Sequence, residues 1–355
     1  MERYKKLQNL MADVDGMMVM QAENRRWLTG FTGSAGIAVV PRSGKPVFMT
    51  DFRYVEQATE QVPGFEIVQA GREMLSTDLQ QVLTKLGIRK LGFEKDHLTV
   101  GQFQKMETAL SDIQLVAQDN VVLELRSEKD GSEIELLAEA VRIADEAFNY
   151  ILDVLKPGLT ERAVALELEH YMQAQGAAGA SFEIIVASGP RSALPHGVAS
   201  EKVLRAGEFV KMDFGCVYQG YCSDITRTVV LGKADERQRE IYHTVLDAQL
   251  AAIDGIRPGL TGADADALAR NLISERGYGD NFGHGLGHGV GLAVHELPTL
   301  SPASTHTLQV NNAVTVEPGI YLPGWGGVRI EDIVVVTETG CRILTSAPKN
   351  LIELA

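Results

Sequence analysis

The first part of the chain, up to about residue 125, alternates short β-rich hydrophobic runs with stretches that have helical spacing. Strands are expected at residues 17–20, 36–40, 47–49, 67–69 and 91–93. Strands that alternate with helices in this way predict a small α/β domain.

A charged stretch, ELRSEKD, occupies residues 124–130 and precedes a long amphipathic helix. Ser132 and Glu135 form a capping-box pattern at the start of this helix, and Pro157-Gly158 ends it. The helix is expected to place one apolar stripe inward: Ile134, Leu137, Val141, Ala144, Phe148, Ile151 and Leu155. We place a domain boundary near residue 127, which gives domains of residues 1–126 and 127–355.

The second part of the chain contains an internal repeat. The segment VLKPGLT at 154–160 returns as GIRPGLT at 255–261. Each copy is followed by a predicted helix that Thr160 or Thr261 caps and that Gly176 or Gly277 closes. The two copies imply a pseudo-twofold domain built from two similar halves.

A second pair of aligned segments carries acidic residues. LRAGEFVKMDFG at 204–215 aligns with LQVNNAVTVEPG at 308–319, which superimposes Asp213 on Glu317. A site on the pseudo-twofold axis would therefore take matching ligands from both halves.

Each half then pairs its acid with another across a predicted hairpin. Asp213 and Asp224 bracket FGCVYQGYCS, and a turn at Tyr218-Gln219, beside Gly220, would set the two carboxylates opposite each other.

In the second half, Glu317 and Glu331 flank PGIYLPGWGGVRI, with Pro323 and three glycines at the turn. Four carboxylates are thus predicted to converge. Burying them together costs many kcal/mol unless cations compensate, so divalent metal is the natural partner. A lone acidic residue in a strand is usually a solvated surface residue, but the duplication argues against that interpretation here.

The segment FGHGLGHGVGLAVHE supplies His284, His288 and His295 among glycines, and one of these histidines is expected to complete the site. Four carboxylates and one imidazole form an oxygen-rich set that suits Mn(II), Fe(II) or Co(II). The glycines could instead form a nucleotide-binding loop, but they lack the spacing of a P-loop or a dinucleotide fingerprint.

Composition narrows the class of protein further. A chain of 355 residues with 45% hydrophobic and 23% charged residues is typical of a globular enzyme with two domains. Its net charge of -14 disfavours nucleic acid and anionic membranes as partners. The start MERYKKLQNL leads into no apolar segment and no stretch reaches the roughly 20 residues of a membrane span, so we expect a cytoplasmic protein with reduced cysteines.

Six motifs together resemble one known family, the pita-bread metallopeptidases related to creatinase and methionine aminopeptidase, and within it the Xaa-Pro dipeptidase (prolidase) and aminopeptidase P branch. These motifs are SGPRSALPHG, KMDFG, CSDITRT, GHGLGHGVGLAVHE, TVEPGIY and GGVRIED. NRRWLTGFTGS at 24–34 resembles the creatinase-like N-terminal domain. The resemblance implies an α/β fold with that small domain ahead of a pseudo-twofold pita-bread catalytic domain.

The resemblance also implies a set of site residues and two divalent metal ions, with Mn²⁺ preferred and Co²⁺, Fe²⁺ or Zn²⁺ as alternatives. The implied ligands are Asp213, Asp224, His288, Glu317 and Glu331. Asp224 and Glu331 would bridge both ions. His288 is preferred over His284 because the family's ligand lies seven residues before a second functional histidine, here His295.

By the same resemblance, the ions activate a shared water and Glu317 shuttles its proton towards the leaving amine. His196 and His295 would donate hydrogen bonds to the substrate carbonyl or the developing oxyanion. Phe182 is expected to form a wall of the proline pocket.

His284 is expected to contact substrate. Arg329 stands two residues before Glu331, so a strand would direct both side chains to one face. This spacing predicts an arginine at the rim of the site that orients substrate or holds a carboxylate.

The implied reaction is hydrolysis of an Xaa-Pro bond in small peptides with proline at the second position. Because this bond has no N–H, it requires a dedicated pocket. Thr299 follows His295-Glu296-Leu297-Pro298 where prolidases often carry an arginine, which leaves aminopeptidase P action on longer peptides open. Further alternatives are an inactive binding protein and a metal-free hydrolase of creatinase type. A homodimer is expected from the resemblance.

Overall fold

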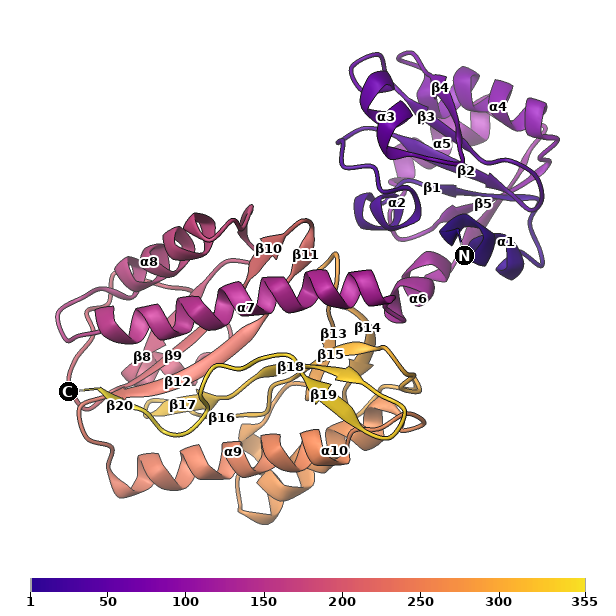
Figure 1. Ribbon diagram of the computed structural model, residues 1–355. Helices are drawn as coiled ribbons and strands as arrows, with labels where there is room; N and C mark the ends of the chain where they lie inside the picture. Colours follow the sequence, from indigo (N-terminus) through magenta and orange to yellow (C-terminus); the bar gives the residue numbers. More distant parts are fainter. Residues whose placement is uncertain (1, 355) are drawn as a thin grey trace. The chain divides into compact units, whose positions relative to one another are not determined.

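The computed structural model describes residues 2–354, and these residues divide into two compact units between Arg126 and Ser127 (Figure 1). Within the described residues, every helix is too short or too polar to span a lipid bilayer.

A mixed sheet forms the centre of the first unit, in the strand order β4-β3-β2-β1-β5-β6. Its strands are β1 (Gly16–Val19), β2 (Ile37–Pro41), β3 (Val47–Thr50), β4 (Glu66–Gln69), β5 (Lys90–Glu94) and β6 (Gln114–Gln118). All five predicted runs form strands. Strand β6 is not among the predicted strands, although Leu115, Val116 and Ala117 form a short apolar run in it; it is an edge strand of exposed and partly buried residues.

Helices flank this sheet and complete the predicted α/β arrangement. They are α1 (Arg3–Leu10), α2 (Ala22–Thr29), α3 (Val55–Gln61), α4 (Leu79–Leu86), α5 (Val100–Ala109) and α6 (Val121–Ser127), with a π-helical turn at Met74–Asp78. Leu79 and Leu83 of α4 pack with Val39 and Leu91 of the sheet in one buried cluster. The prediction of a mixed α/β domain is confirmed.

The long helix α7 (Gly131–Val154) opens the second unit, but its cap differs from the predicted one. Asp130 accepts a hydrogen bond from the Glu133 backbone N–H at 3.0 Å, and Glu133 accepts one from the Asp130 N–H at 2.9 Å. This reciprocal pair forms the capping box, and Ser132 lies inside the first turn. The helix ends before Pro157 because the residue preceding a proline disfavours helical geometry.

The repeated segments form equivalent structures in the two halves. Thr160 caps its helix by accepting from the Ala163 N–H at 3.1 Å, and Thr261 accepts from the Asp264 N–H at 3.0 Å. Gly176 and Gly277 follow these helices with φ angles of +100° and +86°. The helices of this unit after α7 are α8 (Glu161–Ala174), α9 (Glu236–Gly255) and α10 (Gly262–Glu275), with 3₁₀ turns at Gly189–Ala193 and Gly279–Asn281.

Backbone hydrogen bonds repeat in the same way. The Gly158 N–H donates to the Leu204 carbonyl at 3.0 Å, and the Gly259 N–H donates to the Leu308 carbonyl at 2.9 Å. The expected pseudo-twofold arrangement is therefore confirmed at the level of individual contacts.

The strands of the second unit form sheets in the orders β20-β12-β9-β8, β14-β13-β15-β18-β19, β11-β10-β7 and β16-β17. Their bounds are β7 (Gly179–Ala180), β8 (Ile185–Ser188), β9 (Phe209–Phe214), β10 (Cys216–Tyr218), β11 (Tyr221–Cys222), β12 (Ile225–Leu231), β13 (Gly287–Gly289), β14 (Glu296–Leu300), β15 (Ala313–Val316), β16 (Gly319–Leu322), β17 (Gly326–Arg329), β18 (Asp332–Val336), β19 (Cys341–Ile343) and β20 (Glu353–Leu354).

Each half of this unit has its own helices packed on its strands. Phe148 of α7 and Leu168 of α8 belong to a buried cluster with strands β8, β9 and β12. Val245 of α9 and Ala269 of α10 belong to a second cluster that includes β15 and β18. In the view of Figure 1, the strands lie between α7 with α8 and α9 with α10.

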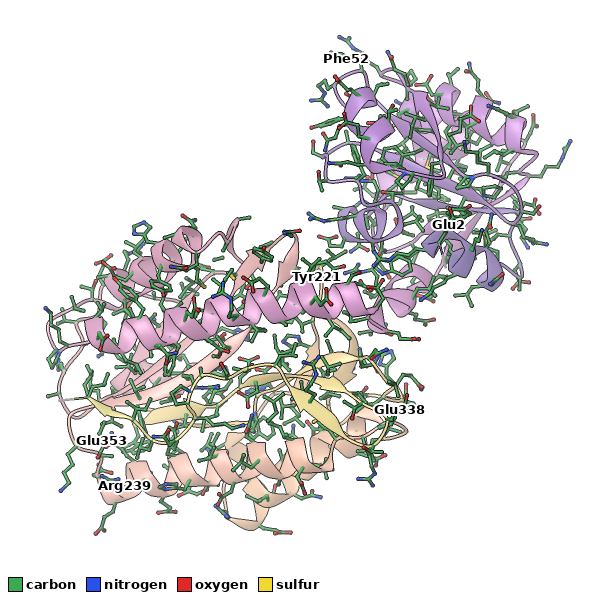
Figure 2. All side chains as sticks on the ribbon, in the orientation of Figure 1. Glu2, Phe52, Tyr221, Arg239, Glu338 and Glu353 are labelled. Atoms are coloured by element: carbon green, nitrogen blue, oxygen red, sulfur yellow. The ribbon has the colours of Figure 1, made fainter. Side chains whose placement is uncertain are left out.

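Two further contacts join segments of this unit that lie far apart in the sequence. Figure 2 shows Tyr221 beside α7, and its hydroxyl donates to the Glu133 carboxylate at 2.9 Å. Arg239 of α9 pairs with Glu353 of β20.

All three cysteines are free thiols, as expected.

Candidate metal centre

The first acidic hairpin turns at Gln219-Gly220, one residue later than predicted. Both turn residues have positive φ angles, +46° and +89°, and Tyr218 pairs with Tyr221 across a two-residue turn. Positive φ at both turn residues matches the right-handed twist of the flanking strands.

This turn sets the register of β9 and β12 and corrects the predicted pairing. Asp213 lies opposite Thr226, not opposite Asp224. Because side chains alternate between faces with a period of two, the shift of two residues keeps Asp224 on the same face as Asp213. The two aspartates therefore lie diagonally to each other.

The second acidic hairpin has the predicted register. Gly319 pairs with Arg329 on one side of the two glutamates, and Val316 pairs with Asp332 on the other. This continuous register sets Glu317 directly opposite Glu331. The turn contains Gly324 with a φ of +78°.

A single cavity of about 500 Å³ brings together every residue predicted for the site. These residues are Phe182, His196, Asp213, Asp224, His284, His288, His295, Glu317, Arg329 and Glu331. They come from loops and strands of both halves, so the predicted convergence of the two hairpins is present in the structure.

His288 directs its imidazole at the acids. Its Nε2 lies 3.2 Å from Oε1 of Glu317 and 3.7 Å from Oδ2 of Asp224. Its Nδ1 lies 3.1 Å from the Gly289 carbonyl, which can only accept, so Nδ1 carries a proton. Burial acts to lower the pKa of His288, but the hydrogen bond to Glu317 and the charge of that carboxylate outweigh it and raise this pKa. Nε2 therefore donates to Glu317 here and would give up that proton to bind a cation. Ligand atoms of Asp224, His288 and Glu331 all lie within 4.8 Å of one another, a spacing suited to a shared cation.

His284 contacts other groups. Its Nδ1 lies 2.8 Å from the Gly285 carbonyl and its Nε2 lies 2.8 Å from the Tyr321 hydroxyl. Burial lowers the pKa of His284, so its ring is neutral at pH 7. Both ring nitrogens are therefore used within the protein.

Arg329 lies beneath the carboxylates, which corrects its predicted place at the rim. Its side chain is 4% exposed and forms an ion pair with Asp213. Nε is 2.9 Å from the Thr226 hydroxyl, and Nη1 is 2.8 Å from the Tyr321 hydroxyl and 3.2 Å from the Pro195 carbonyl. The spacing correctly placed Arg329 on the face of Glu331, but that face packs against the other half of the domain.

Burial and mutual repulsion perturb the acids strongly. Burial, together with the neighbouring carboxylates, raises the pKa of Asp224 and of Glu331 well above their usual range. Burial also acts to raise the pKa of Glu317, but the hydrogen bond and charge of His288 and the charge of Arg329 outweigh it and lower this pKa to about 2. The acids cannot all ionise at neutral pH unless cations join them.

Unsatisfied oxygens show that these residues fit a cation site. Oδ1 of Asp213 and Oε1 of Glu331 are buried and have no hydrogen-bond partner among residues 2–354. Such atoms are rare in proteins because they forfeit their hydration without replacement. Carboxylate oxygens with one imidazole nitrogen are ligands that Mn²⁺ and similar divalent ions accept, so the residues fit the predicted group.

Three residues that support the site were not predicted. Thr226 and Tyr321 contact Arg329, and Lys211 donates to the Leu194 and Pro195 carbonyls. Lys211, Thr226 and Tyr321 each lie two or four residues from a predicted ligand in the same strand pair. A period-of-two count from Asp213 and Asp224 would have placed Lys211 and Thr226 on the ligand face, and this is the signal that could have found them.

Comparison with known proteins gives consistent results for both units. The family model described as metallopeptidase family M24 matches residues 135–338, and the creatinase/prolidase N-terminal domain model matches residues 3–127. An uncharacterized peptidase of Bacillus subtilis is 51% identical over 354 residues, which cover 99% of this chain and 100% of that protein.

Solved structures agree over the full length of the chain. An Xaa-Pro dipeptidase from Bacillus anthracis superimposes with a TM-score of 0.96 at 49% identity, covering 99% of this chain and 98% of that one. An X-Pro aminopeptidase from Thermotoga maritima superimposes with a TM-score of 0.91 at 37% identity, covering 98% and 99%. The resemblance seen in the motifs is confirmed, and the chain belongs to metallopeptidase family M24.

Proposed function

We propose that this protein is an Xaa-Pro dipeptidase that cleaves the bond before proline with the help of two divalent metal ions. The observation that carries the proposal is the meeting of four acids and one imidazole in a single cavity, with buried carboxylate oxygens that lack partners among the described residues. The similarity to an Xaa-Pro dipeptidase over nearly the whole chain supports the choice of substrate.

We assign Asp213, Asp224, His288, Glu317 and Glu331 as the residues that would hold the two ions. When bound, divalent ions supply a water of lowered pKa and polarise the scissile carbonyl. The oxygen-rich ligand set favours Mn²⁺ over zinc, which usually binds nitrogen and sulfur.

Glu317 is suited to hold and pass on a proton. Its carboxylate lines the cavity beside His288, so it can accept a proton and deliver it to the proline nitrogen as the bond breaks. Because that nitrogen carries no hydrogen in the substrate, the delivered proton completes the leaving amine.

His196 and His295 line the same cavity and are assigned to the substrate carbonyl oxygen. Burial, together with the nearby His288, lowers the pKa of His295, so a neutral ring with one N–H donor is present. A donor placed at this oxygen stabilises the charge that develops there during attack.

Part of the remaining wall of the cavity is apolar and suits a proline ring, and Glu183, Thr299 and Ser301 complete that wall. Phe182, Ile185, Val198 and Val294 contribute to the apolar part. We assign Phe182 to the proline pocket and His284, held by Tyr321, to the adjacent wall. An apolar pocket of this kind favours a ring without hydrogen-bonding groups.

One observation favours a second candidate, an Xaa-Pro aminopeptidase that acts on longer peptides. Among the described residues that line the cavity, Arg329 is the single Arg or Lys, and its guanidinium already binds Asp213, Thr226, Tyr321 and the Pro195 carbonyl. The free carboxylate of a dipeptide would therefore have no uncommitted arginine or lysine in this cavity to bind.

Comparing substrates and metal content tests the proposal. Turnover of Ala-Pro and of Ala-Pro-Xaa tripeptides is measured on the purified protein, after chelation, and after Mn²⁺ is returned. We expect Ala-Pro hydrolysis to disappear on chelation and to return with metal. Cleavage of both substrates would identify an aminopeptidase, and turnover that chelation leaves intact would exclude the two-ion mechanism.

The cytoplasmic location and the homodimer expected from the sequence stay predictions. Light scattering of the purified protein at several concentrations tests the dimer.

A further inference from the structure

Thr226 occupies a position between the two halves of the site. It lies on β12, is fully buried, and faces Asp213 across the β9–β12 pair. Its hydroxyl oxygen is 2.7 Å from Oε2 of Glu331 and 2.9 Å from Nε of Arg329. A residue of the first half therefore contacts two charged residues of the second half.

The direction of these hydrogen bonds follows from the available protons. The Nε–H of Arg329 can only donate, so the Thr226 oxygen accepts from it. A hydroxyl has one proton, and the Thr226 hydroxyl donates it to Oε2 of Glu331. Thr226 therefore accepts from Arg329 and donates to Glu331.

One oxygen of a carboxylate from each half is fixed as a result. Thr226 holds Oε2 of Glu331, and Arg329, which Thr226 orients, holds Oδ2 of Asp213. The other oxygens, Oε1 of Glu331 and Oδ1 of Asp213, are the buried atoms that have no partner within the described chain. The Thr226–Arg329 contact therefore decides which oxygen of each carboxylate stays free to bind a cation.

We propose that Thr226 is a positioning residue of the metal centre, whose hydroxyl aligns Glu331 directly and Asp213 through Arg329 so that both present their free oxygens to the cations. The inference rests on the proposed two-ion function. In this role, Thr226 links Asp213 of the first half to Glu331 of the second half.

Replacing the hydroxyl by a methyl group isolates this role. Thr226→Val keeps the shape of the side chain but leaves Nε of Arg329 and Oε2 of Glu331 without their shared partner. Loss of a residue that orients a metal ligand typically weakens metal affinity by about 10–100-fold. We expect a loss of this size for Mn²⁺, with kcat reduced when the metal is limiting.

Thr228 offers a matched control on the same strand and face. It is 1% exposed, and within residues 2–354 its hydroxyl forms hydrogen bonds with the Arg329 backbone alone. It accepts from N at 3.3 Å and donates to O at 3.0 Å. Thr228→Val removes a buried hydroxyl without touching a carboxylate. We expect this variant to bind metal within about threefold of the unmodified protein.

The test uses full-length protein stripped of metal by a chelator. Mn²⁺ is titrated by calorimetry, and the visible spectrum of the Co²⁺-loaded protein reports the ligand geometry. We expect Thr226→Val to show weakened binding and a changed Co²⁺ spectrum, and Thr226→Ser, which restores the hydroxyl, to recover both. Thr226→Ala provides the same comparison should the valine variant fold poorly by circular dichroism.

Three outcomes would overturn the inference: unchanged Mn²⁺ affinity in Thr226→Val, an equal loss in Thr228→Val, or no recovery in Thr226→Ser. Absence of Mn²⁺ binding in the unmodified protein would instead contradict the proposed function. The two failures are thus distinguishable by the behaviour of the unmodified chain.

Discussion

The two halves of the catalytic unit have the same backbone plan but different chemistry at equivalent positions. Asp213 and Glu317 align in the repeat, yet Asp213 pairs with Arg329 whereas Glu317 contacts His288 and lies 3.1 Å from the Thr315 hydroxyl. The aspartates lie diagonally across their hairpin, and the glutamates lie directly opposite each other.

This difference shows that a duplication specifies the backbone positions of the acids but not the residues that contact them. The repeated turns, caps and strands deliver one acid to each side of the site. The partners of that acid decide its role, because a carboxylate held by a buried guanidinium stays fixed whereas one beside an imidazole can exchange protons. On the proposed mechanism, the similar halves would supply one anchoring acid, Asp213, and one reactive acid, Glu317.

The largest expected effect distinguishes these two acids directly. Glu317→Gln removes the group that accepts a proton, so we expect kcat for Ala-Pro hydrolysis to fall by about 10²–10⁴-fold. Asp213→Asn leaves Arg329 buried without its carboxylate partner. Breaking a buried ion pair in this way costs about 3–5 kcal/mol, so this variant should also lose thermal stability.

Thermal unfolding of the metal-free proteins separates the two variants. Glu317→Gln should melt near the unmodified protein, and Asp213→Asn should melt well below it. Equal losses of stability would show that the halves do not divide the roles as proposed.

A second comparison concerns the residues two positions before these acids. Burial and the charge of Arg329 lower the pKa of Lys211 to about 6, and its Nζ lies 2.5 Å from the Leu194 carbonyl and 3.3 Å from that of Pro195. Lys211 therefore supports the loop that leads into His196. Since a displacement of about 1 Å at a site can cost about 10²-fold in rate, we expect Lys211→Met to lower kcat/KM for Ala-Pro by about 10–100-fold.

Thr315, the equivalent residue in the second half, provides the control. Its hydroxyl contacts the backbone N–H of His288 and the Glu317 carboxylate, both at 3.1 Å. Thr315→Val should weaken Mn²⁺ binding, whereas Lys211→Met should leave it unchanged. Loss of Mn²⁺ affinity in Lys211→Met would contradict the role assigned to Lys211.

More of the site geometry could be predicted from the sequence for the second half than for the first. The acids, the caps and the direct opposition of Glu317 and Glu331 depend on local patterns, which a repeat makes visible. The register of the first hairpin could not be predicted because it depends on a positive φ at Gln219, a conformation that non-glycine residues adopt rarely. The burial of Arg329 depends on how the two halves pack, and no local pattern encodes that packing.

Substitution of the glycines at equivalent positions in the two halves is expected to have a smaller effect, on the free energy of unfolding. A Cβ at Gly215 would overlap the backbone oxygen of Ser223, whereas a Cβ at Gly319 would meet the Tyr321 hydroxyl, at 2.5 Å. Gly215→Ala therefore requires the backbone to shift and should cost about 1–3 kcal/mol of unfolding free energy. Gly319→Ala displaces a side chain that contacts His284 and Arg329, so we expect it to lower activity more than stability.

Urea denaturation and Ala-Pro hydrolysis, measured on both glycine variants, check this assignment. A larger stability loss in Gly319→Ala than in Gly215→Ala would contradict it.

The smallest expected effect concerns the two helix caps, Thr160 and Thr261, at which the two halves should behave alike. Thr160 and Thr261 each accept one backbone N–H at a helix start, and replacing such a cap by alanine costs about 1 kcal/mol. The Thr261 hydroxyl also donates to the Asp264 carboxylate at 2.7 Å, and Thr261→Ala removes this contact, whereas the Thr261 N–H still donates to Asp264. Because the hydroxyl contact is exposed to solvent, its loss adds little to the cost. We therefore expect melting temperatures to fall by about 2–4 °C in each variant. Because the two caps share no partner, the double variant should show the sum of the single shifts, and a clear excess would reveal coupling between the halves beyond the acids.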